Sequence, residues 1–253
     1  MRSSLRWMIL AVAVGSTTAT QGSSLLVVPP GFNALDAAAL NAGFKELGPG
    51  SSKFLYSTFG AYKLGTLWDK SSIVVCWMSP TSPSATVRDQ IETAVAMTWS
   101  KAISIRFTGW GNCSDVSNPD IRIDVAKSMS ATYALGSKLK GYNPGMLLRI
   151  DYSKSKDCKD LDAAKPYTCL QANAVHEFGH ALGLAHENQR LDAPDWCKHT
   201  SQIADTSKPL PDATIGQADQ ESIMNYCNLD AFNRGTLSLG DIATVQKLYS
   251  AIM

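Results

Sequence analysis

One twelve-residue stretch decides how this sequence folds and what it binds: residues 176–187 read His-Glu-Phe-Gly-His-Ala-Leu-Gly-Leu-Ala-His-Glu. Three of the four histidines in the chain lie within it. Positions i and i+4 share one face of an α-helix, so His176 and His180 can direct two imidazoles at one ion. Gly183 tolerates a positive φ, which lets the helix end there and brings His186 back as a third nitrogen ligand. The spacing therefore predicts a metal site made of three histidines.

The donor set predicts the metal and its chemistry. Three neutral imidazoles leave one position of a tetrahedral zinc ion open, which is typical of a catalytic site, and the ion lowers the pKa of its water to about 7. Glu177 is rotated by about 100° from His176 around the helix, so it borders the ion without having to ligate it. We expect one Zn²⁺ per chain, with Glu177 as the general base that assists attack of the zinc-bound water on a carbonyl. An amphipathic helix with incidental polar residues would not explain the third histidine.

These residues also carry a family resemblance. Residues 176–184 resemble the zinc signature of the matrixins, and residues 186–192 resemble that of the astacins, where a Glu follows the third His. Residues 222–226, Ser-Ile-Met-Asn-Tyr, resemble the astacin Met-turn, and Leu67-Trp68 resembles the start of astacin-type catalytic domains. The chain is thus similar to the metzincin zinc metallopeptidases, most closely to the astacin-like ones, over about residues 66–253.

The resemblance implies roles for two residues of the Met-turn. Met224 would lie beneath the zinc as a hydrophobic floor. Tyr226 would be a mobile fifth ligand that swings away to hydrogen-bond the tetrahedral intermediate, which makes it the second expected catalytic residue beside Glu177. Considered without this context, a buried Met and a core Tyr would be the simpler explanation.

The resemblance and the order of the elements both predict an α+β fold. Alternating or β-branched apolar residues predict strands at residues 72–77, 103–107, 121–125 and 146–152. Helical spacing predicts helices that begin at Ser84, near Gln171 and at Ser238. A metzincin-like catalytic domain implies a twisted mixed five-stranded sheet with two long helices above it, a zinc cleft, and an irregular C-terminal subdomain ending in a helix. Because such domains pair an extended substrate with an edge strand, we expect residues 146–152 to be that edge.

The N-terminus predicts secretion. Arg2 and Arg6 flank the start of an apolar run, Trp7–Val14, and small residues follow it, as in a signal peptide. The run is about half the roughly 20 residues that a membrane span needs. Cleavage after Ala19 is favoured, with Gly15 as an alternative. We expect a signal peptide at 1–19, a pro-segment or N-terminal extension at 20–63, and a zinc metallopeptidase catalytic domain at 64–253.

Six cysteines without a Cys-x-x-Cys pair predict three disulfides in an extracellular protein. Fifteen pairings are possible. From their places relative to the expected strands and the zinc motif, we propose Cys76–Cys113, Cys158–Cys169 and Cys197–Cys227.

Charge and composition limit the partners. Lys and Arg number 23 against 22 Asp and Glu, which gives no electrostatic basis for binding nucleic acid or a membrane surface. We expect a protein or peptide substrate and a monomer. Four acidic residues could hold a structural Ca²⁺ as in matrixins, Asp151, Asp157, Asp160 and Asp162. Their spacing matches no calcium loop, so a solvated acidic loop is the alternative.

The leading hypothesis is a secreted zinc-dependent endopeptidase that hydrolyses peptide bonds in proteins. One alternative is a catalytically inactive metzincin fold used as a secreted binding module, which the intact Glu177 argues against. Another is a zinc hydrolase of a non-peptide amide, which the motif alone does not exclude.

Latency would have to work without a cysteine, because residues 21–62 contain none. In astacins the Glu after the third His is linked to the freed N-terminus. Glu187 holds that position here, and a cut between Gly60 and Trp68 would supply the ammonium group. The alternative is that Glu187 forms an ordinary ion pair, for instance with Arg190.

Overall fold

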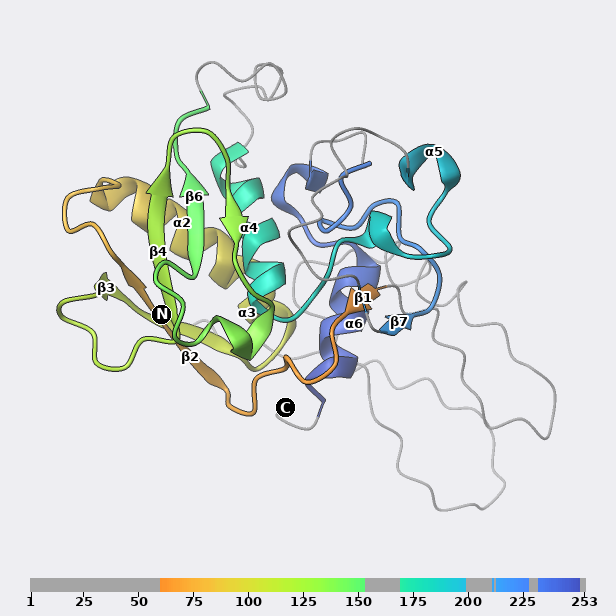
Figure 1. Ribbon diagram of the computed structural model, residues 1–253, viewed down its shortest axis with the longest axis horizontal. Coiled ribbons are helices and arrows are strands. Elements are labelled where there is room, and N and C mark those ends of the chain that lie inside the picture. The colour runs from red at the N-terminus through yellow and green to blue at the C-terminus, as the bar shows by residue number, and fades with distance from the viewer. Residues whose placement is uncertain (1–59, 153–168, 199–210, 212, 228–231, 251–253) are drawn as a thin grey trace, which may run out of the picture.

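The computed structural model describes residues 60–152, 169–198, 211, 213–227 and 232–250. The expected signal peptide and most of the expected N-terminal extension lie outside these residues. Within them, a sheet with two long helices stands beside a less regular C-terminal part (Figure 1). No helix in the described part of the chain combines the length and the apolar character that crossing a membrane requires.

The predicted α+β fold and its five-stranded mixed sheet are confirmed. The strands are β2 (Ser72–Trp77), β3 (Arg106–Asn112), β4 (Ile121–Ala126), β5 (Ala131–Thr132) and β6 (Met146–Arg149). They lie in the order β3-β2-β4-β6-β5, and every neighbouring pair is parallel except β5 with β6, which is antiparallel. The strand expected at 103–107 begins only at Arg106, because Ile103 and Ile105 are buried in the connection from the preceding helix.

The prediction that residues 146–152 form the edge of the sheet is wrong. β6 is an inner strand that lies between β4 and β5. The edge is β5, where Ala131 pairs with Leu147 and Thr132 pairs with Met146. A strand of two residues is too short to show a period in the sequence, so β5 could not be recognised there.

Helices cover one face of the sheet. The long ones are α2 (Ala85–Met97) and α4 (Cys169–Ala181), with short α3 (Trp99–Ala102) following α2. As predicted, Ser84 caps α2, and its hydroxyl accepts from Val87 N. The second predicted cap, at Ser238, begins α6 (Leu239–Leu248) with a full capping box formed with Asp241.

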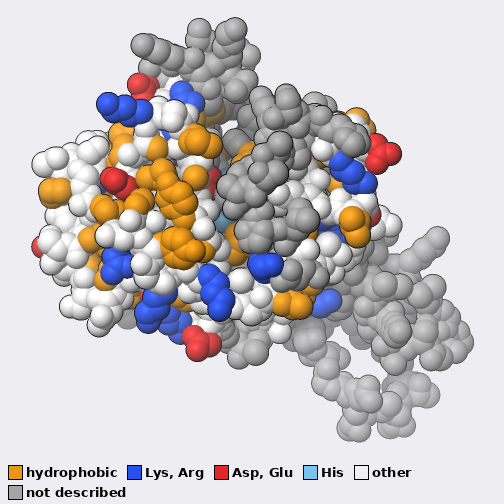
Figure 2. Space-filling view, viewed as in Figure 1, with side chains coloured by type: hydrophobic (Ala, Val, Ile, Leu, Met, Phe, Trp, Pro, Cys, Tyr) orange, Lys and Arg blue, Asp and Glu red, His pale blue; other side chains and the backbone are white. Residues whose placement is uncertain are grey.

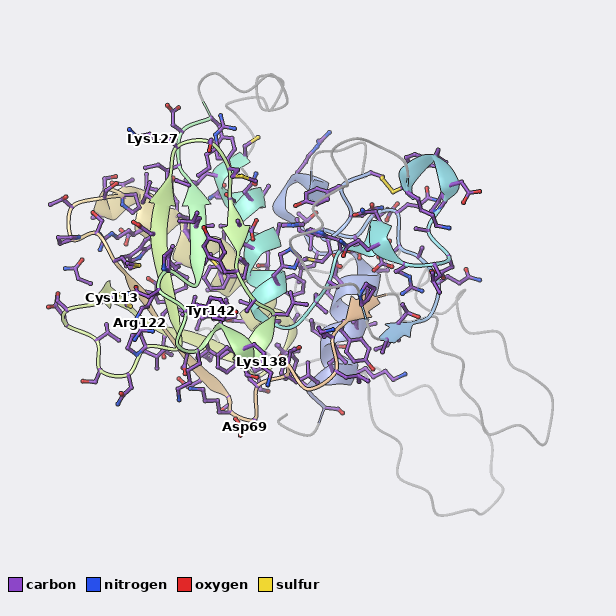
Figure 3. The ribbon with its side chains drawn as sticks, in the orientation of Figure 1. Asp69, Cys113, Arg122, Lys127, Lys138 and Tyr142 are labelled. Atoms are coloured by element: carbon purple, nitrogen blue, oxygen red, sulfur yellow. A yellow bond between two sulfur atoms is a disulfide. The ribbon has the colours of Figure 1, made fainter. Side chains whose placement is uncertain are left out.

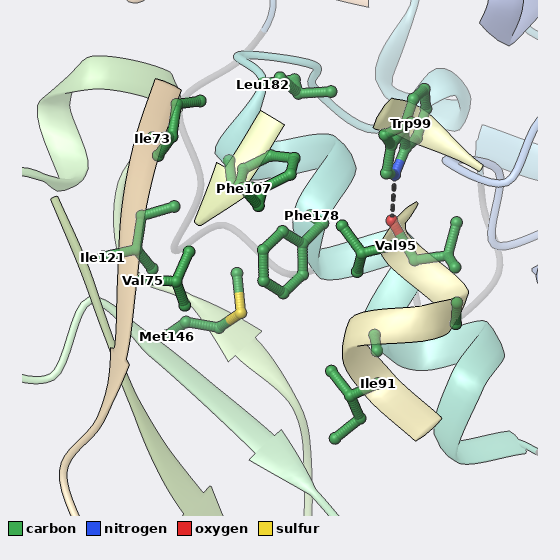
Figure 4. Packing of buried hydrophobic residues seen from close by; sticks show 14 of the residues in the cluster. Ile73, Val75, Ile91, Val95, Trp99, Phe107, Ile121, Met146, Phe178 and Leu182 are labelled. Carbon is green, nitrogen blue, oxygen red and sulfur yellow. Dashed lines mark hydrogen bonds between the residues drawn. The ribbon is translucent and has the colours of Figure 1, made fainter. Parts of the chain in front are cut away.

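The core joins α4 to the sheet through aromatic side chains (Figure 4). Phe178 of α4 packs edge-on against Phe107 of β3 at 4.8 Å and stacks on Trp110 at 5.4 Å between ring centroids. Trp99 Nε1 donates to Val175 O at 2.7 Å. The aromatic contacts and this buried hydrogen bond fix α4 on the sheet, and with it the histidines that α4 carries.

The C-terminal part is irregular, as predicted. It contains the short helix α5 (Asp195–Lys198), the strand β7 (Ala213–Ile215) and α6. β7 pairs antiparallel with β1 (Gly60–Tyr62). β1 falls within the expected N-terminal extension, so part of that extension is built into this region. The boundary at residue 63 stays a prediction.

Two predicted disulfides are confirmed. Cys76 is bonded to Cys113, which Figure 3 labels, and Cys197 is bonded to Cys227. Cys169 is also disulfide-bonded, and its predicted partner Cys158 lies outside the described residues. The expected acidic loop lies mostly outside them as well, since only Asp151 of its four carboxylates is described.

Candidate metal centre and active site

The three histidines of the motif meet at one point. His176 and His180 extend from α4, and their rings lie 4.8 Å apart between centroids. The helix ends as the sequence predicts, because Gly183 has a φ of 88° and the chain turns back there to His186. The nitrogen atoms that could bind a metal lie within 4.8 Å of one another, and all three side chains are buried.

Contacts from other elements fix the end of α4. Trp68 Nε1 donates to Ala181 O at 2.7 Å, and Tyr249 Oη donates to Leu182 O at 2.8 Å. Beyond the turn, Ala185 N donates to Ala61 O of β1 at 2.8 Å. A Cβ at Gly183 would lie 2.9 Å from Thr66 Oγ1, so both its positive φ and the space available require glycine there. The turn that leads to the third histidine is therefore fixed by residues near both ends of the described chain.

Hydrogen bonds orient two of the imidazoles. His176 Nδ1 lies 2.8 Å from Ile223 O, and His180 Nδ1 lies 2.7 Å from Leu184 O. A carbonyl oxygen can only accept, so each Nδ1 carries the proton and each Nε2 presents its lone pair.

The donor set fits zinc. His180 Nε2 lies 2.9 Å from His186 Nε2, and two nitrogens bound tetrahedrally to zinc lie about 3.3 Å apart. Small shifts of two side chains therefore bring this pair to the zinc distance. Buried nitrogen ligands with carbonyl partners behind them are typical of zinc sites in proteins.

The Met-turn lies against the histidines. The side chain of Met224 is buried, and a Cβ at Gly179 would collide with its Sδ. Met224 O accepts from Glu187 N at 3.0 Å, and the neighbouring carbonyl of Ile223 is the one that holds His176. Met224 thus occupies the place that the resemblance implies for it, against the helix that carries two histidines.

Asp241 holds this turn, a role that sequence analysis missed. Its Oδ2 accepts from Ile223 N at 2.9 Å, and its Oδ1 accepts from Ser222 Oγ at 2.6 Å. Oδ2 also accepts from Ser238 N at 2.9 Å, which completes the capping box. Burial raises the pKa of Asp241 to about 6, against the effect of these three donors. The carboxylate is therefore ionised at neutral pH and acts as a charged acceptor.

Of the two expected catalytic residues, Tyr226 lies against the histidine rings and Glu177 follows His176 on α4. The Tyr226 ring lies 4.4 Å from that of His186 and 5.2 Å from that of His176, between centroids. Glu177 is buried on α4, and its Oε2 accepts a hydrogen bond from Thr132 Oγ1 of β5 at 2.6 Å. In Figure 2, histidine colour is visible in the hollow between the two parts of the molecule, beside hydrophobic side chains that lie over β4 and β6.

Glu187 is bound by Arg190, one of the two possibilities that the sequence left open. Arg190 Nε lies 3.3 Å from Glu187 Oε1, which also accepts from Asp219 N at 2.9 Å. Burial raises the pKa of Glu187 to about 8. The Asp219 N–H and the Arg190 guanidinium lower it, but their effect is smaller than that of burial. Arg190 is itself buried and donates to three backbone carbonyls, those of Gly60, Ile215 and Gly216. A link between Glu187 and a freed N-terminus stays a prediction.

Comparisons with known proteins agree with this geometry. The family model described as Matrixin matches residues 68–193, which include the histidine motif. No curated protein matches the chain. Among solved structures, myroilysin is similar at 21% identity with a TM-score of 0.52, over 75% of this chain and 98% of that one. The hatching enzyme zinc-protease HCE-1 from the medaka fish Oryzias latipes has 19% identity and a TM-score of 0.46, over 73% of this chain and 94% of that one.

The family match and the metal centre support the same conclusion. The match spans the five strands of the large sheet, α4 and all three histidines, and the fold agrees with that of myroilysin. The chain is a zinc metalloendopeptidase of the metzincin group.

Proposed function

We propose that this protein is secreted and cleaves peptide bonds in other proteins, with zinc held by His176, His180 and His186. The observation that carries the proposal is the convergence of three buried imidazoles, with the buried Glu177 next to His176 on the same helix. Secretion is supported by the signal-like N-terminus and by the disulfides Cys76–Cys113 and Cys197–Cys227, which form and persist in oxidising compartments.

Zinc bound at this site would acidify a water molecule and polarise the substrate carbonyl. Glu177 would accept the proton of the attacking water and deliver it to the leaving amine. Tyr226 would donate a hydrogen bond to the negative charge that develops on the carbonyl oxygen. Its ring contacts with His186 and His176 keep it beside the ligands, where such charge arises.

The substrate would bind as an extended chain along β5. β6 occupies one side of β5, and β5 is the end strand of the sheet on its other side. Addition of a strand to a sheet edge recognises main chain and leaves specificity to the side-chain pockets. Two exposed apolar side chains flank β5, Met129 and Tyr133. We therefore expect peptides with apolar residues near the scissile bond to be preferred, and the enzyme to act as a monomer.

The proposal is tested with the protein purified from the medium of a secreting host. Hydrolysis of an unfolded protein should stop when a chelator removes the metal and return when Zn²⁺ is added back. N-terminal sequencing of the same material locates the start of the secreted chain. A chain that binds unfolded protein without cutting it would support the binding-module alternative. Cleavage of small amides but not of peptides would support the other hydrolase alternative.

A further inference from the structure

The edge strand and the general base are joined by one buried side chain. Thr132 is 2% exposed, and its Oγ1 lies 2.6 Å from Glu177 Oε2 and 3.2 Å from Glu177 O. A hydroxyl carries a single hydrogen, and the carboxylate oxygen is both the closer and the stronger of the two acceptors. The hydrogen bond therefore links β5 to the catalytic carboxylate across 45 residues of sequence.

The strand geometry explains how Thr132 makes this contact. Successive side chains of a strand point to opposite faces, and the neighbours of Thr132 are more exposed, with Ala131 half-buried and Tyr133 exposed. The main chain of β5 is fixed by pairing with β6 and by Tyr133 N, which donates to Gly145 O at 2.9 Å. The hydroxyl of Thr132 is therefore presented to α4 from a rigid support.

A general base must hold one oxygen within hydrogen-bonding distance of the proton that it takes. The terminal torsion of a glutamate is broad and is not fixed by its own rotamer preference. A hydroxyl bound to Oε2 restricts that torsion and so fixes the direction of Oε1. We propose that Thr132 is the positioning residue of Glu177 and couples the strand that receives the substrate to the base that acts on it. This inference rests on the proposed roles of Glu177 and β5.

The test compares Thr132→Val, which keeps the shape and removes the hydroxyl, with Thr132→Ser, which keeps the hydroxyl. The full zinc-loaded enzyme is assayed on a fluorogenic peptide for kcat and KM, and zinc is counted per chain. Thr98→Val is the matched control, because Thr98 is also buried and its hydroxyl donates to a helix carbonyl, Ala94 O at 2.6 Å, outside the site.

We expect Thr132→Val to lower kcat about tenfold or more, to change KM less than about twofold, and to keep one zinc per chain. Thr132→Ser should restore most of kcat, and Thr98→Val should leave kcat near that of the wild type. On a Glu177→Ala background, Thr132→Val should cause no further loss, since Thr132 acts through that carboxylate.

Three results would overturn the inference: loss of zinc in Thr132→Val, an equal loss of kcat in Thr98→Val, or failure of Thr132→Ser to restore kcat. If Thr132→Val does not fold, the serine variant and the double variant Glu177→Ala with Thr132→Ser decide the question. A serine variant that folds but stays as slow as Glu177→Ala would also overturn it. An inactive wild type with full zinc would instead refute the proposed function, so the two failures are distinguishable.

Discussion

Replacing Asp241 should weaken both the fold and the metal centre, because its carboxylate holds the Met-turn through Ser222 and Ile223. In Asp241→Ala, the N–H groups of Ile223 and Ser238 lose their shared acceptor and the hydroxyl of Ser222 loses its partner. Each buried donor left without a partner costs about 1–3 kcal/mol, so the two N–H groups together cost about 2–6 kcal/mol. For a domain of this size, that corresponds to a Tm lower by about 5–20 °C.

The same change should weaken zinc binding. Ile223 O is the acceptor that orients His176, and Asp241 fixes the peptide unit just before it by binding Ile223 N. Loss of groups that orient a metal ligand typically costs 10–100-fold in affinity. Zinc affinity is measured by competition with a chromophoric chelator, and Tm is measured by thermal unfolding of the metal-loaded and chelated protein.

A control variant shows what the loss of a helix cap alone does. Ser84→Ala removes the hydroxyl cap of α2, which costs about 1 kcal/mol and leaves the Met-turn intact. It should lower Tm slightly and leave zinc affinity unchanged. If Asp241→Ala bound zinc within twofold of the wild type, Asp241 would be a helix cap and nothing more, and the reasoning about the turn would be refuted.

Three further predictions concern the same centre. His180→Ala should lose both zinc and activity, and a purified variant that keeps one zinc per chain would show that the ligand set is wrong. Tyr226→Phe should lower kcat with little change in KM, because its hydroxyl acts on charge that exists only after water attack; an effect on KM alone would make Tyr226 a pocket wall. Because the pKa of Asp241 is raised in the folded state to about 6, the folded protein binds a proton there more readily than the unfolded chain. The free energy of unfolding of the wild type relative to Asp241→Asn should therefore rise as the pH falls from about 7 to 5, and denaturant titrations that show the opposite slope would contradict this.

The histidine motif could be predicted because its information is local. Helical spacing places His176 and His180 on one face, and a single glycine determines where the chain turns toward His186. The two confirmed disulfides followed from the places of their cysteines, since Cys76 and Cys113 each follow an expected strand, whereas Cys197 follows the zinc motif and Cys227 directly follows the Met-turn. Strand and helix positions came from periodicity in the same way.

What the sequence could not reveal depends on non-local pairing. The edge strand was misassigned because β5 has only two residues. In addition, β5 precedes β6 in the chain but lies outside it in the sheet. β1 and β7 have three residues each and show no period. The hydrogen bonds from Thr132 to Glu177 and from Ile223 to Asp241 join segments that only the folded chain brings together. In the sequence, Asp241 is fully explained as a capping residue, so nothing indicated its second role.

The most direct test of the central claim is to measure zinc content and peptide hydrolysis together in the wild type and in Glu177→Ala. Glu177 follows His176 on α4 and is not part of the metal-binding group of the three histidines. We therefore expect both proteins to hold one zinc per chain and the variant to hydrolyse peptides about 10²-fold more slowly or worse. Hydrolysis at the wild-type rate by zinc-loaded Glu177→Ala would contradict the account.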